Sequence, residues 1–419
     1  MPGTPVAPSP VNRDGDRGGQ RVLVIGAGPV GLSAALALRS LGLSPMVFEA
    51  DAQETVRRGS RALFLHRESL KLLERMSPGL ATKIAAHGLT WSTKRTIYGR
   101  RQVFSRTYPV ARGVMPPFIS LAQPDTERHL RQACVSAGVE FIWSARIKAA
   151  RSTAEYATVE TEDGRCWDAE YIIAADGARS AVRRSLGIKL HGSRSESVHV
   201  VVDLEEDTAD PMPVERVFNY RHPALAGRNV LLIPFAGGWQ IDLQCKPSDK
   251  PEELTTKDAL SQWVPKVVDG KYRDRIAWVS TYHFQQVVAE TFIDPQRRLL
   301  LVGEAAHLFA PFGARGMNSG IADADVAASA IVTALAAAHS GRANGAVEDF
   351  DRARREAARH NEQAASAALA HLRPTSMVGR VRQRAAAKLA PTVKAVGVWL
   401  DEAPYGPRTR PPSNPTGKY

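Results

Sequence analysis

Continuous apolar runs and helical stretches alternate at both ends of the chain, whereas the middle of the chain follows another pattern. Runs of this kind are typical of parallel strands that are covered on both faces. They lie at residues 22–25, 171–175 and 298–302. The first run precedes an alanine- and leucine-rich helix and a second strand that ends at Glu49, so residues 21–49 predict a βαβ unit. The pattern therefore predicts an α/β body.

The pattern changes between residues 196 and 245. Four strand-like runs are joined there by turns rich in Pro, Gly and Asp, which predicts an antiparallel sheet inserted into the α/β body. The four runs are residues 198–204, 214–220, 229–234 and 239–245. Residues 275–288 predict further strands rich in aromatic side chains, and residues 352–388 predict an Ala/Arg/Glu-rich covering helix. We interpret the inserted sheet as the wall that selects the bound small molecule.

Composition fits a globular protein of two interleaved domains, with 419 residues of which 44% are hydrophobic and 23% charged. The net charge of +12 comes from dispersed arginines without an aromatic-studded basic groove, so nucleic acid is not an expected partner. Three cysteines without CxxC spacing predict a reducing cytoplasm, no disulfide and no zinc site. Residues 1–19 predict a disordered leader. Residues 321–339 contain Asp323 and Asp325, so we expect a buried helix and no membrane span.

The turn after the first strand carries Gly26, Gly28 and Gly31. In a strand–turn–helix setting Gly26 permits the tight turn, Gly28 lets the backbone approach a pyrophosphate, and Gly31 allows the helix to pack closely. Glu49 then offers a carboxylate to an adenosine ribose. The alternative is an ordinary glycine-rich turn. The motif predicts dinucleotide binding, but it does not distinguish FAD from NAD.

Two further strands end in polar, glycine-bearing turns, where parallel sheets bind ligands. Residues 171–175 open into Asp176-Gly177, with an N-cap turn as the plain alternative, and residues 298–302 open into Gly303-Glu304. The loop 311–316 follows, and a long helix is predicted to begin near Asn318. Its N-terminus would favour negative charge over Gly316.

Taken together, three segments resemble the single-component flavoprotein aromatic monooxygenases of the para-hydroxybenzoate hydroxylase type. They are Gly26–Gly31 with Glu49, Asp176-Gly177 with Arg179, Ser180 and Arg183, and residues 303–323 (GEAAHLFAPFGARGMNSGIAD). The resemblance covers roughly residues 21–339. It implies an FAD-dependent, NAD(P)H-consuming monooxygenase that hydroxylates an aromatic or electron-rich small molecule. In such enzymes the reduced flavin adds O2 as a C4a-hydroperoxide, which the substrate ring attacks.

The family's cofactor contacts carry over position by position. Gly26, Gly28 and Gly31 would meet the FAD pyrophosphate and Glu49 the ribose, while Arg61 would reach the phosphates and Gln123 would lie near the flavin. Asp176 and Gly177 match the Asp-Gly turn that engages FAD and NAD(P)H. Gly303 and Glu304 match the pair whose acid binds the ribityl chain. The positions expected against the isoalloxazine are Pro311, Gly313, Gly316, Met317 and Asn318. The family usually has Asp where this chain has Glu304, and the added methylene must shift the ribityl chain or bend the loop.

The resemblance also divides the chain into domains. The FAD-binding domain takes residues 20–95, 117–190 and 285–345, and the substrate domain takes residues 96–116 and 191–284. Residues 346–402 form C-terminal helices and residues 403–419 a tail. The fold class is thus α/β with an added antiparallel sheet, that is, a Rossmann-type domain with an inserted substrate domain. We expect FAD to be bound tightly and NADPH or NADH to dock transiently near Arg179 and Arg183, with O2 and an aromatic substrate as the other partners and a monomer or homodimer as the assembly.

Ring attack is easier from a phenolate or an amine-substituted ring, so a base or hydrogen-bond partner is expected in the inserted sheet. The candidates are Tyr220, His222, Gln240, Tyr282 and His283. Tyr220 and His222 are preferred, with Pro311 beside the flavin, although a Tyr or His in a sheet is more often a wall residue. His307 is expected to support its loop. The alternatives are a halogenase, whose Trp-x-Trp-x-Ile-Pro run is missing, a reductase, or a non-oxygenating FAD protein that shelters a reactive intermediate.

Overall fold

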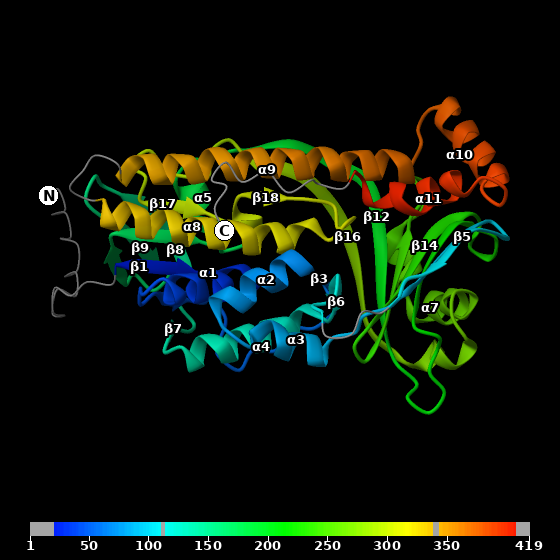
Figure 1. Ribbon diagram of the computed structural model, residues 1–419, viewed down its shortest axis with the longest axis horizontal. Helices are drawn as coiled ribbons and strands as arrows, with labels where there is room; N and C mark the ends of the chain where they lie inside the picture. Colours follow the sequence, from blue (N-terminus) through cyan, green and yellow to red (C-terminus); the bar gives the residue numbers. More distant parts are fainter. Residues whose placement is uncertain (1–20, 110–113, 338–342, 408–419) are drawn as a thin grey trace, which may run out of the picture.

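Five parallel strands form the sheet of the nucleotide-binding body, which lies at one end of the elongated molecule (Figure 1). The computed structural model describes residues 21–109, 114–337 and 343–407, so the predicted leader and the tail beyond residue 407 lie outside the described residues. The strand order is β17 (Leu299–Leu301), β11 (Tyr171–Ala174), β1 (Val22–Ile25), β2 (Met46–Phe48) and β7 (Glu140–Ile142). The predicted parallel α/β sheet is confirmed.

Helices cover this sheet and bury its apolar strands. α1 (Pro29–Ser40) packs between α4 (Gln123–Ser136) and α8 (Arg315–Ala336), and α8 packs in turn on α9 (Ala343–Leu372). Gly320 allows α8 to approach α1, because a Cβ at this position would lie 2.4 Å from the Val30 side chain. α8 is long and apolar enough to cross a membrane, yet 61% of its most apolar window is buried inside the protein. It is the central helix of the body.

A mixed eight-stranded sheet forms the other end of the molecule (Figure 1). Its order is β18 (His307–Leu308), β16 (Ile276–Ala289), β12 (Leu190–Glu205), β15 (Gly238–Gln244), β14 (Arg228–Phe235), β13 (Glu215–His222), β4 (Thr93–Tyr98) and β5 (Arg101–Thr107). The sheet is antiparallel, as predicted, except that β13 pairs with β4 in parallel. The sequence analysis assigned residues 20–95 to the FAD-binding domain, whereas β4 of the eight-stranded sheet already begins at Thr93.

Alternation along the strands gives this sheet two different faces. On β12, Val200, Val202 and Leu204 belong to an apolar cluster that includes Trp263 of α7 (Lys257–Trp263), and we call this side the outer face. The inner face is turned toward the body and the C-terminal helices. It carries His199 and Asp203 of the same strand. One strand therefore serves an apolar core and a polar interior at once.

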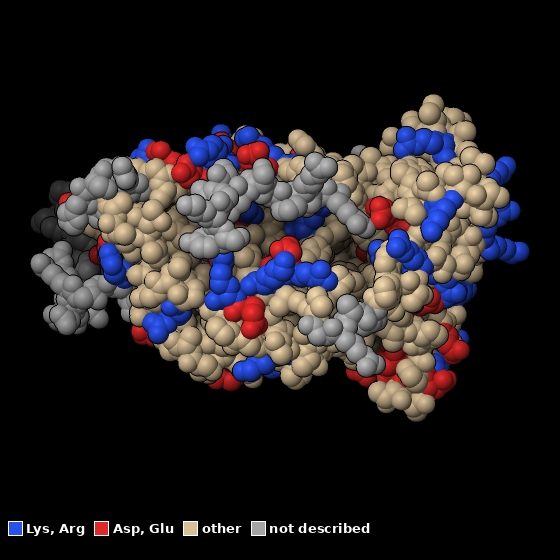
Figure 2. Space-filling view, viewed as in Figure 1, with Lys and Arg blue, Asp and Glu red and all other residues tan. Residues whose placement is uncertain are grey.

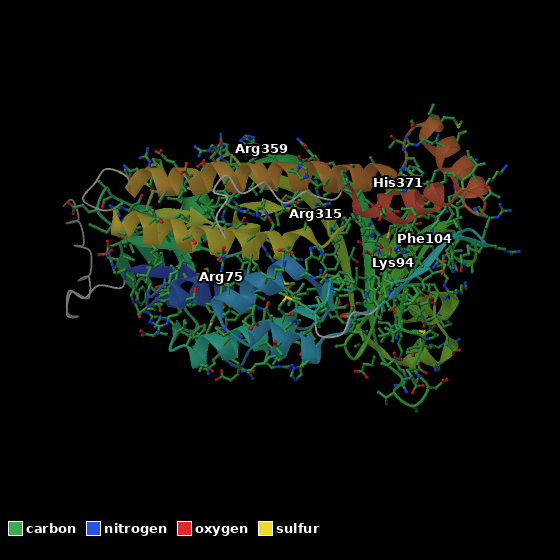
Figure 3. The ribbon with its side chains drawn as sticks, in the orientation of Figure 1. Arg75, Lys94, Phe104, Arg315, Arg359 and His371 are labelled. Carbon is green, nitrogen blue, oxygen red and sulfur yellow. The ribbon has the colours of Figure 1, made fainter. Side chains whose placement is uncertain are left out.

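The C-terminal helices cap the inner face. The predicted helix over residues 352–388 is broken, since α9 ends at Leu372 and α10 (Met377–Leu389) starts after Pro374, which cannot continue a helix. α11 (Lys394–Glu402) and a 3-10 turn at Ala403–Tyr405 follow. Figure 3 labels Arg315 at the start of α8 and His371 near the end of α9, next to this cap.

The remaining elements connect the two sheets or flank the body. Three strands form a separate antiparallel sheet, namely β8 (Ile147–Ser152), β9 (Ala157–Thr161) and β10 (Cys166–Ala169). β3 (Phe64–His66) pairs with β6 (Phe118–Ser120), next to α2 (Arg67–Met76) and α3 (Leu80–His87), and α5 (Ala181–Ser185) follows β11. The β3–β6 pair lies between the body and the eight-stranded sheet (Figure 1).

Candidate functional site

The three glycine-bearing turns meet at one edge of the parallel sheet. Ile25 pairs with Ala174, and Ala174 pairs with Leu301, so the three strands end level with one another. The turns that begin at Gly26, Asp176 and Gly303 therefore leave the sheet side by side. This convergence is the arrangement that the sequence predicted.

The glycines of the first turn have different physical roles. Gly26 has a φ of +101°, and a Cβ there would lie 2.5 Å from the Ala175 carbonyl oxygen. A Cβ at Gly31 would lie 1.8 Å from the carbonyl oxygen of Gly26. At Gly28 the nearest atom to such a Cβ is a guanidinium nitrogen of Arg57, 3.9 Å away. Gly26 and Gly31 are thus required by the protein's own packing, whereas a Cβ at Gly28, at the N-terminus of α1, would make only an ordinary van der Waals contact.

The second turn and the start of α8 face open space. A Cβ at Gly177 or at Gly316, in the first turn of α8, would meet no atom within 4 Å, whereas a Cβ at Gly303 in the third turn would lie 3.0 Å from the Val30 side chain. Asp176 accepts a hydrogen bond from Val182 N through Oδ2 (3.1 Å), while its Oδ1 is buried without a partner. Burial raises the pKa of the Asp176 carboxyl above its ordinary value. The unsatisfied oxygen and the two bare glycines fit a dinucleotide that brings hydroxyl donors and phosphates.

Glu49 is held in place beside the first turn. The carboxylate is 6% exposed and accepts hydrogen bonds from Ala27 N (2.7 Å), Asp51 N (3.0 Å) and Arg57 Nη2 (3.1 Å). Two of these three bonds end on Oε1, so Oε2 keeps acceptor capacity toward a ribose hydroxyl. The predicted ribose contact is compatible with this geometry.

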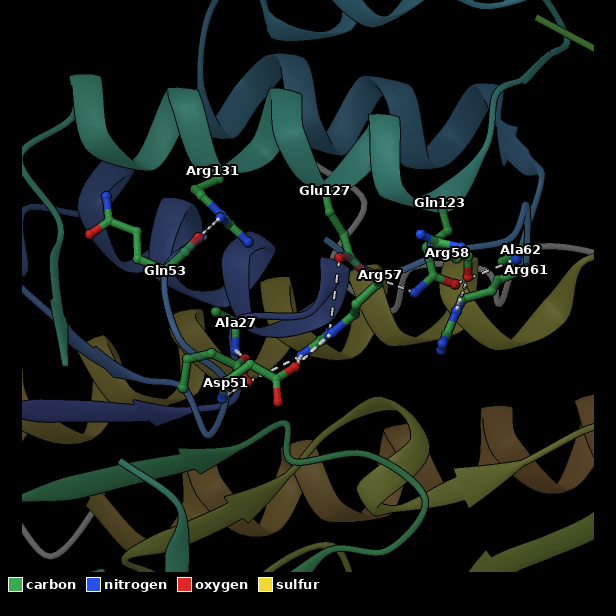
Figure 4. Close-up of polar contacts among 11 residues, drawn as sticks. Ala27, Asp51, Gln53, Arg57, Arg58, Arg61, Ala62, Gln123, Glu127 and Arg131 are labelled. Atoms are coloured by element: carbon green, nitrogen blue, oxygen red, sulfur yellow. Dashed lines mark hydrogen bonds and ion pairs between the residues drawn. The ribbon is translucent and has the colours of Figure 1, made fainter. Parts of the chain in front are cut away.

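Arg57 is the arginine that lies beside the glycine-rich turn (Figure 4). It forms ion pairs with Glu49 and Asp51 at 3.1 and 3.0 Å, and its Nη1 lies 3.9 Å from Glu127. Burial lowers the pKa of Arg57, but these three acids outweigh burial and raise it above the ordinary value. The resemblance assigned the phosphate contact to Arg61, which has a φ of +49° and lies close enough to Glu304 to lower the pKa of its carboxyl. The phosphate contact of Arg61 stays a prediction.

Gln123 joins the segment after Arg57 to α4. Its backbone N–H donates to Ser60 O (2.9 Å), its Oε1 accepts a long bond from Ala62 N (3.4 Å), and its Nε2 donates to Glu127 (2.8 Å). Figure 4 shows Gln123 beside Arg61 and Ala62. The side chain therefore fixes the segment that borders the predicted flavin position.

The Glu304 residue of the third turn is exposed to solvent, although its carboxyl group has many protein atoms around it. Burial raises the pKa of the Glu304 carboxyl, and His307, Arg61 and the Ala178 backbone oppose that rise. The turn itself is anchored from behind by Asp323 of α8. Asp323 accepts hydrogen bonds from Gly303 N (3.0 Å), His307 Nε2 (2.7 Å) and Arg354 Nε (2.6 Å).

The buried Asp323 cluster explains why His307 is not free for chemistry. Burial alone would raise the pKa of Asp323, but Arg354 and His307 lower it to about 2. His307 is fully buried in this pair. The geometry fits the predicted supporting role of His307.

The loop that precedes α8 is fixed on both sides. Asn318, predicted to meet the isoalloxazine, forms four side-chain hydrogen bonds within the protein. Its Oδ1 accepts from His66 N (2.9 Å) and Ser69 Oγ (2.6 Å). Its Nδ2 donates to the carbonyl oxygens of Phe64 (2.8 Å) and Ala314 (2.7 Å). α8 already begins at Arg315, so Asn318 lies in its first turn. Its side chain positions the helix N-terminus, and its contact with the isoalloxazine stays a prediction.

The other loop residues have distinct environments. Pro311 is exposed, and Met317 is 8% exposed and packs with the core of the body. Gly313 has a φ of +81°, and a Cβ there would lie 3.0 Å from Tyr405 O. Sequence reasoning missed Arg315, which donates to Asn361 Oδ1 (3.0 Å) and to the carbonyls of Tyr405 (3.1 Å) and Pro407 (2.8 Å). The predicted tail is therefore held against the loop as far as Pro407.

A polar latch joins the cofactor edge to the inner face of the eight-stranded sheet. Ser60 donates to Asp203 through its N–H (2.7 Å) and its Oγ (2.6 Å), and Gln240 donates to the same hydroxyl. A Cβ at Gly59 would lie 2.4 Å from the Trp278 ring. Burial raises the pKa of the Asp203 carboxyl. Arg57 and Arg61 are thus carried by a segment that the sheet itself holds.

The predicted catalytic candidates of the sheet lie in different places. Tyr220 is 1% exposed, and its hydroxyl bonds to His371 Nε2 and to Leu400 O, both at 2.7 Å. Burial raises the pKa of Tyr220 well above its ordinary value. His222 ends β13, and burial lowers its pKa. His283 is exposed on β16, whereas Tyr282 is half-buried on the inner face. This geometry favours a wall role for Tyr220, and a catalytic role stays a prediction.

Sequence reasoning missed an acid–histidine pair on the inner face. Asp242 Oδ1 lies 2.5 Å from His199 Nδ1, and His199 Nε2 lies 3.2 Å from Ser197 Oγ. The imidazole packs between Phe284 and Phe312, with ring centroids 4.8 and 5.5 Å away. The two residues are 43 positions apart on adjacent strands, so only the strand register could have revealed the pair.

The charge of the molecule is not gathered in a single basic patch on the face that Figure 2 shows. Basic side chains spread over this whole face, with acidic side chains between them (Figure 2). The view gives no indication of a continuous basic groove on this face.

Comparison with known proteins gives the same fold and family. The chain is 28% identical over 393 residues to a 3-(3-hydroxy-phenyl)propionate/3-hydroxycinnamic acid hydroxylase of Mycobacterium avium (strain 104), covering 90% of this chain and 63% of that protein. It is 25% identical over 316 residues to a rifampicin monooxygenase of Rhodococcus hoagii, covering 72% of this chain and 62% of that protein. The chain thus spans less than two thirds of the length of these relatives.

A solved structure shares the fold over nearly the whole chain. The p-nitrophenol 4-monooxygenase of Pseudomonas putida DLL-E4 superimposes with a TM-score of 0.75 at 21% identity, covering 93% of this chain and 99% of that one. The family described as the FAD binding domain matches residues 20–368, which include all three turns and both sheets. The chain belongs to this family of FAD-binding proteins.

Proposed function

We propose that this protein is an FAD-dependent, NAD(P)H-consuming monooxygenase that hydroxylates an aromatic or electron-rich small molecule. The observation that carries the proposal is the link between the edge at Gly28, Asp176 and Gly316 and the inner face of the eight-stranded sheet: Arg57 lies beside Gly28, and Ser60 of the same segment donates to Asp203. The named relatives, which are hydroxylases and monooxygenases, support the same activity.

FAD, when bound, would supply the hydride-accepting and oxygen-activating chemistry. The residues that would hold it are Gly28 and the α1 N-terminus at the pyrophosphate, Glu49 at the ribose, and Asp176 and Glu304 near the linking chain. The backbone at the start of α8 would face the ring and stabilise negative charge. Asp323 and Asn318 keep these groups in position from behind.

We propose a transient site for NAD(P)H on exposed basic groups near Arg179, without a separate nucleotide domain. Arg183, expected to share this role, is 6% exposed and donates to the carbonyls of Ala305 (2.9 Å) and Ala178 (3.3 Å). It therefore fixes the second turn to the third, and Arg179 is the exposed partner of the two. All three cysteines are free thiols, which supports a reducing cytoplasm as the location.

The purified protein tests this function. We expect it to be yellow with one FAD, and to consume NADH or NADPH and O2 with formation of a hydroxylated product when phenols, anthranilates or polyketide-like aromatics are added. Protein that neither contains nor takes up FAD would contradict the cofactor assignment. FAD that NAD(P)H cannot reduce, or reduction without oxygenated product, would favour the sheltering or reductase alternatives.

Substitution of Gly28 separates cofactor binding from folding. Gly28→Ala adds a methyl group that meets no protein atom closer than 3.9 Å, so we expect unchanged thermal unfolding of the FAD-free protein. The methyl group occupies the space open to the pyrophosphate, and we expect FAD affinity to fall by about 10- to 100-fold. Gly345→Ala, at an exposed position of α9 with no atom within 4 Å of the new Cβ, is the control and should leave affinity unchanged.

A further inference from the structure

The large aliphatic side chains of α10 face solvent, whereas its alanines face the protein. Ala386, Ala387 and the C-cap residue Ala390 are buried, and Gln383 beside them donates to His371 O (3.1 Å). The exposed aliphatic residues are Met377 (68%), Val378 (76%), Val381 (55%) and Leu389 (52%). A surface helix of a globular protein usually turns its larger apolar residues inward. The opposite order in α10 therefore indicates a second apolar contact on its outer side.

The exposed apolar residues of α10 lie on one side of the helix. Residues four positions apart are neighbours on a helix surface. We call this set the α10 stripe, and its members are Met377, Val378, Val381, Ala385 and Leu389. The helix is held without the stripe, because Ser376 caps it by accepting from Gly379 N (3.0 Å) and Arg382 lies over the Trp399 ring of α11 at 4.9 Å. The stripe is thus free to contact something outside the chain.

Basic side chains border the α10 stripe. Between Glu362 and Asp401 the sequence contains six Lys and Arg residues and no Asp or Glu. Arg384 and Lys388 are exposed, and each follows a stripe residue by seven positions, which is about two helical turns, so they lie along one edge of the stripe. Within the described part of the chain, neither of them forms an ion pair. The outer side of α10 therefore combines an apolar stripe with unneutralised positive charge.

α10 lies at an end of the molecule that a broad surface can reach. Figure 1 shows it at the end that carries the eight-stranded sheet, away from the parallel sheet of the body. The neighbouring helix α11 packs on β5, since a Cβ at Gly397 would lie 2.5 Å from Val103 O. Arg100 and Arg101 are exposed at the start of β5, and Figure 2 shows basic side chains at this end. A flat partner can therefore touch α10 without covering the edge of the parallel sheet.

The charge of α10 distinguishes among three kinds of partner. A second copy of this chain, related by a twofold axis, would bring Arg384 and Lys388 against the same residues of the other copy. An acidic protein surface would match the basic residues but would place charged groups against the aliphatic stripe. An anionic lipid bilayer matches both features, because its headgroups attract Lys and Arg and its acyl boundary accepts aliphatic side chains.

From these observations we infer that α10 is a membrane-surface contact that attaches the protein to anionic phospholipid. The α10 stripe meets the acyl boundary, and Arg384 and Lys388 meet the headgroups. The helix lies in the plane of the bilayer surface and does not cross it, and the attachment is reversible because one short helix buries little apolar area. This inference goes beyond the proposed monooxygenase activity and does not depend on it.

Sedimentation with lipid vesicles tests the inference on the full chain as purified. The comparison is between phosphatidylcholine vesicles and vesicles that also contain about 30% phosphatidylglycerol. At low salt we expect at least about tenfold stronger binding to the anionic vesicles, and this binding should weaken as salt screens the headgroups. Absence of binding to the anionic vesicles at low salt, or equal binding to both kinds, would overturn the inference.

Two double variants separate the apolar part of the contact from the ionic part. Met377→Ser with Val381→Ser makes the stripe polar, and Arg384→Gln with Lys388→Gln removes charge from its edge. Each should lower binding to the anionic vesicles by about 10- to 30-fold. All four positions are exposed, so thermal unfolding and FAD content should stay as in the wild type.

The control changes the same kinds of residue on the body. Val135→Ser with Lys83→Gln replaces an exposed valine of α4 and an exposed lysine of α3, and vesicle binding should stay unchanged. Vesicle binding that persists undiminished in both α10 variants would overturn the inference. A dimer in sedimentation velocity that these variants abolish, without vesicle binding, would assign the stripe to a second copy. Binding to soluble polyglutamate instead of to vesicles would assign it to an acidic protein, and either outcome contradicts a lipid contact.

Discussion

The two faces of the eight-stranded sheet are made by the same strands and have opposite chemistry. The outer face carries aliphatic side chains and Trp239 under α7, and its residues form one apolar cluster. The inner face carries Asp203, which bonds to Ser60, and the His199–Asp242 pair. Neighbouring residues of a strand point to opposite faces. A residue that stabilises the apolar outer face is therefore followed along the chain by one that lines the polar inner face. Substitutions on the two faces should therefore affect different measurements.

Trp239→Ala should give the largest effect and should affect stability alone. Trp239 is 1% exposed, and its indole donates to Glu206 Oε2 (2.7 Å), so truncation leaves a cavity and an unpaired acceptor. We expect the free energy of unfolding to fall by about 3–5 kcal/mol, measured by denaturant titration. FAD content per folded molecule should stay unchanged in the cold. Loss of FAD from the folded variant would show that the faces are not independent.

Asp203→Ala should affect both stability and the cofactor. It removes the carboxylate that accepts both donors of Ser60, leaving a buried N–H unpaired at a cost of about 1–3 kcal/mol. Since the same segment carries Arg57 and Arg61, FAD should dissociate faster than from the wild type, measured by flavin fluorescence after dilution. Asp258→Ala on α7 is the control. Unchanged FAD retention would mean that the latch does not position the cofactor segment.

Tyr220→Phe should have a small effect. The hydroxyl bonds only to His371 and Leu400 O among the described residues, so its removal should cost about 1 kcal/mol of unfolding free energy. Substrate-dependent NAD(P)H oxidation should keep its rate and its pH profile. A large fall in the maximal rate with unchanged stability would instead support the catalytic role predicted from sequence.

Cysteine labelling should give the smallest effect. Burial raises the pKa of Cys245, on the outer-face cluster, to about 11, so the reactive thiolate is scarce below that pH and grows as pH rises through it. With iodoacetamide at about pH 8 we expect half-buried Cys166 to react well before Cys245. Trp239→Ala should speed labelling of Cys245. Equal rates for both thiols in the wild type would contradict the packing of the outer face.

The sequence predicted the parts of the molecule that depend on local backbone chemistry. Apolar runs followed by glycine turns identified the parallel strands, and equal strand ends brought Gly26, Asp176 and Gly303 together as expected. Gly26 could be assigned because its φ of +101° favours glycine, and Gly31 because a Cβ there would meet the carbonyl oxygen of Gly26, five residues earlier. Rules of this kind act over a few residues, so they can be applied to a sequence alone.

Only the tertiary structure decided which side chains meet. Arg57 is the arginine found beside Gly28, and the Asn318 side chain bonds to residues about 250 positions away. The Asp242–His199 pair depends on strand register, which alternation alone does not fix. Composition and local pattern determine which elements form and which faces are apolar, whereas the partners of buried polar groups are set by packing between distant segments.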